Sequence, residues 1–349
     1  MGATLLVNPE YDLKLLFLEI KMKYNSMKKQ AFKDWKRGTK TPQWAKINKR
    51  KRIYEPEYYT TLNNLQGTLN FLDHKFDKCN FTINSKKQKV VEISRRELDK
   101  QIAFQAQRNG AIIKVRTSFQ EITDKGIRTN EEKIDCKIFV DARGVSTLVQ
   151  KDRTGILSSA QYEIYADWIK KGKVEVIFDQ EKYPGFFAWV IPSNEGKGKV
   201  GVAGKGINVV EALDSILKEK GKFSTIRKIY APIWIKGPIE KFVEGKTVII
   251  GDAAGQAKPT TAGGIFTSGM GGVYAGQAIS KFLKTNKISD LQEYQKRWTE
   301  RFGKEFEKQL LVRKILERID NQTINKLFES ITPEITNEIS EKDDFDFHI

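Results

Sequence analysis

The spacing of hydrophobic residues predicts a strand followed by a long helix in the later part of the chain. Thr247 to Ile250 is a short apolar, β-branched run between turn residues, which is typical of an inner strand covered on both faces. A helix is expected from about Gly263 to Leu283, with Thr260 and Thr261 as candidate caps. From Ser289 to Ser330, apolar residues at helical spacing among dense charges predict one or two amphipathic helices with a core-facing stripe.

The segment from 91 to 149 has the pattern of a helix followed by strands. The helix is expected to end at Asn109-Gly110, and a strand is expected from Ala111 to Arg116. A hairpin around Lys125-Gly126 and an alternating strand from Ile134 to Val140 complete the unit.

From Val174 to Ala203 the pattern changes to alternating strands separated by Gly and Pro turns. The expected strands run from Val174 to Phe178, from Phe186 to Pro192 and from Lys199 to Ala203. Short connections of this kind favour an antiparallel sheet.

The residues after Ile250 have the chemistry of a site for a large anionic ligand. Gly251 permits a backbone conformation closed to other residues, and Asp252 follows the carboxyl end of a strand, where ligands bind in open α/β sheets. We expect Asp252 to face a ligand hydroxyl. The start of the following helix, at Gly263 and Gly264, would offer free N–H groups and a partial positive charge.

These residues resemble the second flavin motif of para-hydroxybenzoate hydroxylase-type FAD enzymes, most closely that of the geranylgeranyl reductases. The matching run is Gly251-Asp252-Ala253-Ala254-Gly255 followed by Lys258-Pro259-Thr260-Thr261-Ala262-Gly263-Gly264, and it departs at Ala262, where the family usually has Gly. The resemblance implies that Asp252 and Gly251 hold the ribityl and pyrophosphate part of FAD. It also implies a flavin-facing helix start at Thr260, Thr261, Gly263 and Gly264.

Further motifs resemble the same family in the same order. Arg95-x-x-Leu98-Asp99 is similar to the start of its middle helix, and Val140-Asp141-Ala142-Arg143-Gly144-Val145-Ser146 is similar to its Val-Asp-Ala-(Thr/Asp)-Gly-x-Ser turn, with Arg143 at the variable position. Arg95, Asp141 and Gly144 are thereby implied to border the adenosine side of the cofactor. The run from Tyr183 to Pro192 resembles the substrate-domain signature, which implies a substrate pocket at Phe187, Trp189 and Pro192; the alternative is that these rings form the core of the sheet itself.

The resemblance covers about residues 90 to 330 and implies an α/β fold. A three-layer, Rossmann-like FAD-binding domain (91–150 and 238–285) would be interleaved with an antiparallel substrate domain (55–90 and 151–237). We expect a basic N-terminal segment at 1–54, a C-terminal helical region at 286–337 and an acidic tail at 338–349. The implied activity is hydride transfer from reduced FAD to isoprenoid C=C bonds of a prenyl lipid precursor.

The composition of the chain bears on its core, its cellular location and the presence of disulfides or a metal site. The 349 residues are 39% hydrophobic, which is enough for a substantial core. We expect a cytoplasmic protein, because no apolar run reaches the length of a membrane span and residues 1 to 18 lack the features of a signal peptide. Cys79 and Cys136 are too isolated for a disulfide framework, no metal site is expected, and core packing is favoured over chemistry for Cys136.

The formal net charge of +17 makes nucleic acid and anionic membranes candidate partners. Residues 1 to 54 hold 14 Lys or Arg against 4 Asp or Glu, so 10 of the 17 excess charges lie outside the flavin-like motifs. Nucleic acid is therefore not the favoured partner. Peripheral contact with an anionic membrane and a simple solvated surface both remain open.

Two rival functions stay open at this point. The run Phe187-Ala188-Trp189-Val190-Ile191-Pro192 is one Phe-for-Trp change from the Trp-x-Trp-x-Ile-Pro of flavin halogenases, so a flavin monooxygenase or halogenase is the enzymatic alternative. A basic binding protein for lipid head groups or nucleic acid, with little flavin affinity, is the other. No residue is singled out as a proton donor.

The dinucleotide loop expected of this enzyme type, Gly-x-Gly-x-x-Gly after an opening strand, is not found in the sequence. Before residue 60 the only glycines are Gly2 and Gly38. Either the opening segment is altered by a misplaced start or a shifted reading frame, or the polypeptide as written binds flavin poorly.

We predict that the polypeptide as written retains FAD weakly. Loss of the loop removes several charge-assisted hydrogen bonds of about 1.5–3 kcal/mol each. Gel filtration followed by absorbance spectroscopy tests this, and a yellow protein with stoichiometric FAD would contradict it.

Overall fold

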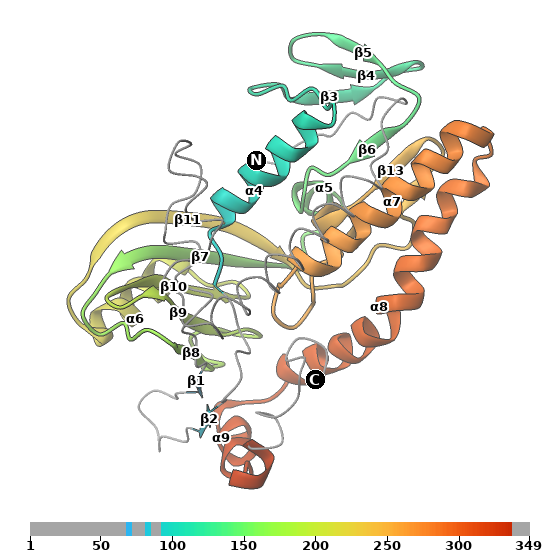
Figure 1. Ribbon diagram of the computed structural model, residues 1–349. Coiled ribbons are helices and arrows are strands. Elements are labelled where there is room, and N and C mark those ends of the chain that lie inside the picture. The colour runs from blue at the N-terminus through green and yellow to red at the C-terminus, as the bar shows by residue number, and fades with distance from the viewer. Residues whose placement is uncertain (1–67, 72–80, 85–91, 337–349) are drawn as a thin grey trace, which may run out of the picture.

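The computed structural model describes residues 68–71, 81–84 and 92–336 (Figure 1). The expected basic segment 1–54 and the acidic tail 338–349 lie outside these residues, as does Cys79. Three sheets and six α-helices make up the described part.

The largest sheet has seven strands in the order β11-β7-β10-β9-β8-β1-β2. All neighbouring strands are antiparallel except β1 and β8. Helix α6 packs on one face against β7 and β10. The elements are β1 (Thr68–Phe71), β2 (Phe81–Asn84), β7 (Ile156–Tyr165), β8 (Lys173–Ile177), β9 (Ala188–Asn194), β10 (Lys197–Gly204), α6 (Val209–Lys220) and β11 (Ser224–Trp234).

The second sheet carries the strand that precedes Gly251. Its order is β12-β13-β6, with β12 (Val243–Glu244) antiparallel and β6 (Phe139–Asp141) parallel to the central β13 (Thr247–Ile249). Helices α7 (Ile265–Thr285) and α8 (Ser289–Leu316) lie side by side next to this sheet (Figure 1). The inner position of β13 agrees with its apolar, β-branched sequence.

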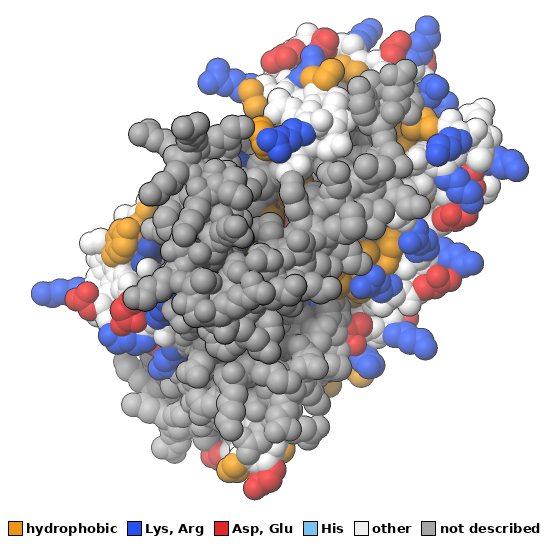
Figure 2. All heavy atoms as spheres, viewed as in Figure 1, with side chains coloured by type: hydrophobic (Ala, Val, Ile, Leu, Met, Phe, Trp, Pro, Cys, Tyr) orange, Lys and Arg blue, Asp and Glu red, His pale blue; other side chains and the backbone are white. Residues whose placement is uncertain are grey.

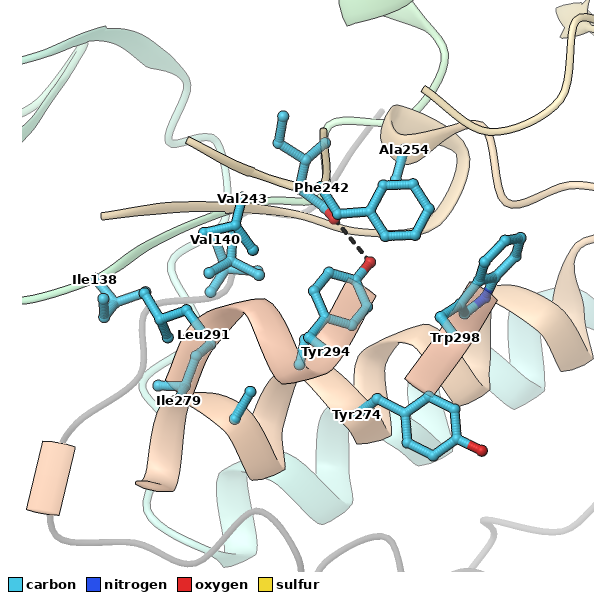
Figure 3. Packing of buried hydrophobic residues seen from close by; sticks show 14 of the residues in the cluster. Ile138, Val140, Phe242, Val243, Ala254, Tyr274, Ile279, Leu291, Tyr294 and Trp298 are labelled. Atoms are coloured by element: carbon cyan, nitrogen blue, oxygen red, sulfur yellow. Dashed lines mark hydrogen bonds between the residues drawn. The ribbon is translucent and has the colours of Figure 1, made fainter. Parts of the chain in front are cut away.

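The main core lies between this sheet and the helix pair. One side of α8 is buried against residues of β6, β13 and α7, and its side chains are Leu291, Tyr294, Trp298, Phe302 and Phe306. Figure 3 shows the first three of them. The predicted stripe is therefore a core face. The stripe is less well buried at the C-terminal end of α8, where Ile315 is half exposed. A separate helix, α9 (Asn321–Glu329), follows.

A smaller sheet and two helices complete the described chain. Helix α4 (Arg95–Arg108) starts at Ser94, whose hydroxyl accepts from the Glu97 N–H, and ends at Asn109 as predicted. The hairpin around Lys125-Gly126 is also present. It belongs to the sheet β3 (Phe119–Ile122), β4 (Gly126–Thr129) and β5 (Lys133–Asp135), and α5 (Ser146–Lys151) follows β6.

Two strand predictions in this region are wrong. Ala111 to Arg116 forms no strand; the side chains of Ile112 and Val115 are exposed, so burial does not hold the segment against a sheet. The single strand expected from Ile134 to Val140 is divided between β5 and β6, which belong to different sheets. The apolar alternation continued across the break and concealed it.

A buried hydrogen-bond network fixes the turn after β13. The Gln256 side chain accepts from the Gly251 N–H (2.8 Å) and donates to the Tyr294 hydroxyl (2.8 Å). Burial raises the pKa of Tyr294, so its hydroxyl stays protonated and donates to the Ile249 carbonyl (2.8 Å; Figure 3). Gly271 of α7 gives this amide room, because a Cβ there would lie 2.3 Å from Gln256 Oε1.

We predict that Tyr294→Phe lowers the free energy of unfolding by about 1–3 kcal/mol, because it leaves two buried polar groups without a partner. Tyr165→Phe is the matched control, since Tyr165 is 55% exposed, and its effect should stay within about 0.5 kcal/mol. Denaturant unfolding measures both. Equal effects would contradict a role for the network.

Candidate functional site

The structure brings the two predicted turns together at one edge of the second sheet. Ile249 of β13 is paired with Asp141 of β6, and the Ile250 N–H donates to the Asp141 carbonyl (3.0 Å). Because β6 and β13 are parallel, the Asp141 turn and the Gly251-Asp252 turn both leave the carboxyl ends of neighbouring strands. Ligands bind at this edge in open α/β sheets.

The Asp141 carboxylate is buried and is held by Arg143. Arg143 donates from Nη2 to Asp141 Oδ2 (2.8 Å), and from Nε (3.0 Å) and the backbone N–H (3.1 Å) to Oδ1. The guanidinium also lies 4.1 Å from the centre of the Phe119 ring. Arg143 thus places a half-buried cation, paired with Asp141, at the position where the resembling family usually has Thr or Asp. Gly144, at φ +77°, continues the turn with open space beside it.

The Asp252 carboxylate lies beside Gly264 at the start of α7 and is partly accessible to solvent. No described residue donates a hydrogen bond to it. Partial desolvation by the surrounding protein raises the pKa of Asp252, and the positive charge of Arg95 opposes that shift. Arg95, at the start of α4, is therefore within electrostatic reach of Asp252, so the structure brings together two of the predicted cofactor residues.

The start of α7 forms a cradle beside Asp252. A Cβ on Gly264 would lie 3.2 Å from both Asp252 Oδ1 and Ser268 Oγ. Ser268 Oγ is buried and has no hydrogen-bond partner among the residues that the structure describes, and Gly251 is in the left-handed region at φ +66°. An unmet hydroxyl, a free carboxylate and two small residues fit a polar group that lies against backbone, as the predicted flavin would. Sequence reasoning missed Ser268.

The loop before α7 differs from the prediction in its capping. The residue preceding the helix is Gly264, and neither Thr260 nor Thr261 caps it through a side chain. Thr260 is buried and donates to Gln309 Oε1 of α8 (3.0 Å), whereas Thr261 Oγ1 accepts weakly from the Gly263 N–H (3.4 Å). The Thr260 hydroxyl is therefore bonded to α8 and does not cap α7.

Aromatic side chains of the seven-stranded sheet lie against this loop. Phe187 and Trp189 pack against a buried cluster of Leu157, Phe186, Ala203 and Ile235, and Ala262 of the loop packs against the same cluster. The Trp189 ring lies over Gly201 of β10, where a Cβ would come within 2.3 Å, and its Nε1 donates to Gln161 (3.0 Å). The predicted substrate residues Phe187 and Trp189 are thus next to the predicted flavin-facing loop.

Pro192 is not brought to the same place. Pro192 follows Ala188 and Val190 at every second position of β9, and these two residues belong to the core under α6. Side chains alternate between faces along a strand, so Pro192 lies on the α6 face, opposite Phe187 and Trp189. Its assignment to the pocket does not follow from the structure.

An ion pair joins the aromatic face to the start of α4. Lys199 of β10 pairs with Glu92 and also donates to the Ile93 carbonyl (3.3 Å). Both side chains are largely shielded from solvent. The pair holds the seven-stranded sheet next to Arg95, and sequence reasoning did not identify it.

Other site types find little support in the described ranges. No group of three or more His, Cys, Asp or Glu residues there could hold a metal, and none of the helices there could span a membrane. Cys136 is half-buried and its thiol pKa is raised by burial, which disfavours the reactive thiolate.

Comparison with known proteins shows similarity along most of the chain. An uncharacterised protein of Methanocaldococcus jannaschii is 32% identical over 260 residues, which are 68% of this chain and 66% of that protein, or just under two thirds of its length. A digeranylgeranylglycerophospholipid reductase of the same organism is 30% identical over 277 residues, covering 72% and 71% of the two chains. No protein-family model matches.

Solved structures show the same fold. A geranylgeranyl bacteriochlorophyll reductase-like protein from Thermoplasma acidophilum superposes with a TM-score of 0.67 at 21% identity, covering 80% of both chains. A flavin-dependent brominase gives 0.56 at 14% identity, covering 79% of this chain and 75% of its own. The predicted α/β fold, with an antiparallel sheet and C-terminal helices, is confirmed. The precise domain boundaries stay predictions.

We predict that Ala262→Gly raises the free energy of unfolding by about 0.5–1 kcal/mol. Ala262 has φ +56°, a left-handed conformation that costs a non-glycine residue about 1–2 kcal/mol and outweighs loss of one half-buried methyl group. The matched control is Ala212→Gly in α6, which should lower stability by about 1 kcal/mol. Destabilisation at both positions in denaturant unfolding would contradict the strain at Ala262.

Proposed function

We propose that this chain, which belongs to the geranylgeranyl reductase family of flavin-dependent oxidoreductases, uses FAD to reduce isoprenoid C=C bonds of a prenyl lipid precursor. Its relatives named digeranylgeranylglycerophospholipid reductase support a phospholipid-type substrate with long unsaturated chains.

One observation carries the proposal: the loop before α7 and the aromatic face of the seven-stranded sheet share a cluster. Ala262, Phe187 and Trp189 all pack against the same buried cluster, which consists of Leu157, Phe186, Ala203 and Ile235. A flavin held at the start of α7 would therefore lie beside an aromatic wall, which suits an isoprenoid chain.

The residues around the strand ends would hold the cofactor in distinct ways. The Asp252 carboxylate would accept from a ribityl hydroxyl, which would offset the partial desolvation that raises its pKa. Arg95 and Arg143 would face the negatively charged phosphates, with Arg143 kept in place by Asp141. Ser268 Oγ, buried and unpaired, would meet a polar edge of the cofactor.

The hydride would come from reduced FAD held at the start of α7, and a proton would have to be added to the other carbon of the double bond. The protein's own contribution is to orient a double bond and to exclude water. Gln161 holds the Trp189 indole by a 3.0 Å hydrogen bond, and Phe186 stacks on Phe187 at 4.2 Å between ring centres. These contacts fix the wall and keep it apolar, which limits side reactions with solvent.

Membrane contact and cytoplasmic location stay predictions. Around the edge of the face seen in Figure 2, Lys and Arg side chains of the described residues are interspersed with Asp and Glu. Most of the excess positive charge belongs to residues 1–54, outside the described part.

We predict that Asp252→Ala weakens FAD binding about tenfold or more, because it removes a charge-assisted hydrogen bond. Asp124→Ala, in the exposed β3–β4 turn, should leave affinity unchanged. Titration of flavin fluorescence with each protein measures this. Unchanged affinity in Asp252→Ala would contradict the assigned role.

The reaction is tested by incubating the protein with dithionite-reduced FAD and a geranylgeranyl lipid in the absence of oxygen. Mass spectrometry should show addition of hydrogen across isoprenoid double bonds. An unchanged lipid, together with oxygen-dependent hydroxylation or halogenation of an aromatic compound, would favour the rival flavin enzyme.

A further inference from the structure

The C-terminal half of α8 carries buried donors that no group in the described part of the chain satisfies. Arg313 is 3% exposed and Gln309 is fully buried, yet Arg313 Nη1 and Nη2 and Gln309 Nε2 have no hydrogen-bond partner among residues 68–71, 81–84 and 92–336. Gln180 Nε2, in the connection between β8 and β9, is in the same state. Buried donors are nearly always paired in native proteins, so unmet donors close together call for a partner.

Contacts connect these three side chains into one site. Gln180 Oε1 accepts from the Gly185 N–H (2.8 Å), and a Cβ on Gly185 would lie 3.2 Å from Arg313 Nη2. Gln309 precedes Arg313 by one helical turn and accepts from Thr260 of the loop before α7 (3.0 Å). The donors therefore extend from the β8–β9 connection toward the proposed flavin loop.

The charge of the site suits an oxyanion. Arg313 Nε donates to Glu317 (3.1 Å), which leaves the edge formed by Nη1 and Nη2 unused. Such an edge matches phosphate or carboxylate oxygens in a two-pronged arrangement. One buried oxygen of Glu305, a turn before Gln309, also lacks a partner and offers an acceptor for a hydroxyl group. Phosphate next to hydroxyl or ester oxygens is the chemistry of a glycerophosphate.

The site adjoins the aromatic wall. The Arg313 guanidinium lies 5.4 Å from the centre of the Phe186 ring, and Phe186 stacks on Phe187. An isoprenoid chain along Phe187 and Trp189 would therefore place a polar end at Arg313.

We propose that Arg313, Gln309 and Gln180 bind the phosphate-bearing polar end of the lipid substrate, and so set which double bond reaches the flavin. This assignment rests on the proposed function for the identity of the ligand. The site itself rests on the unmet donors.

The test measures binding of geranylgeranyl diphosphate, geranylgeraniol and inorganic diphosphate to the full chain by intrinsic tryptophan fluorescence. The variants are Arg313→Met, which keeps side-chain length without the charge, Arg313→Lys, and Arg318→Met as an exposed control a few residues later. Thermal unfolding establishes that each is folded. If Arg313→Met does not fold, Arg313→Lys carries the comparison, because it keeps the charge but loses the fork.

Arg313→Met should weaken geranylgeranyl diphosphate binding about tenfold or more, with geranylgeraniol binding and Arg318→Met unchanged. Equal binding of geranylgeranyl diphosphate by wild type and Arg313→Met would overturn the proposal. If inorganic diphosphate binds as tightly as the lipid and is lost in Arg313→Met, the site is an oxyanion site but not a lipid one, which overturns the assigned ligand.

The lipid-reduction assay separates this inference from the proposed function. Reduction of both the phosphorylated lipid and the alcohol at equal efficiency, in wild type and Arg313→Met alike, would sink the phosphate site and leave the reductase intact. Selective phosphate binding without reduction of any lipid would support the site and contradict the reductase.

Discussion

The parallel pairing of β6 with β13 is the constraint on which the rest of the site depends. It brings two turns that are more than a hundred residues apart to one sheet edge, with Ile249 opposite Asp141. The turn after β13 is then fixed from within, since Gln256 and Tyr294 satisfy the Gly251 N–H and the Ile249 carbonyl. Within the described ranges no residue donates to the Asp252 carboxylate at this strand end, which leaves it available to the proposed cofactor.

The seven-stranded sheet also contacts the loop before α7 and the segment before α4. Ala262 lies in the aromatic cluster of the seven-stranded sheet, while Lys199 ties the same sheet to Glu92 at the start of α4. These contacts place a rigid aromatic wall beside the glycine-rich start of α7. A hydride donor and an isoprenoid acceptor need such a fixed approach, because reaction requires close and oriented atoms.

Sequence reasoning succeeded where local chemistry decides structure. The β-branched run before Gly251, the stop at Asn109-Gly110 and the apolar stripe of α8 all have strong local signals, and the structure places them as predicted. The strands β7 and β11 were missed. The sequence of β11 is charged and largely exposed, because it forms the edge of the sheet.

Long-range partners were beyond the reach of a single sequence. Nothing local shows that the Thr260 hydroxyl donates to Gln309, or which face of β9 Pro192 occupies. Arg313 likewise appeared only as one charge among many on an amphipathic helix. Its significance comes from burial without partners, which only the folded chain reveals.

Reoxidation of reduced flavin by a lipid tests the proposed reduction of isoprenoid double bonds most directly. Protein-bound FAD is reduced under strict exclusion of oxygen and mixed with a geranylgeranyl phospholipid, and the absorbance of oxidised flavin is recorded over time. The account predicts that oxidised flavin returns in proportion to the lipid added and that the lipid gains hydrogen. Flavin that stays reduced until oxygen is admitted would contradict it.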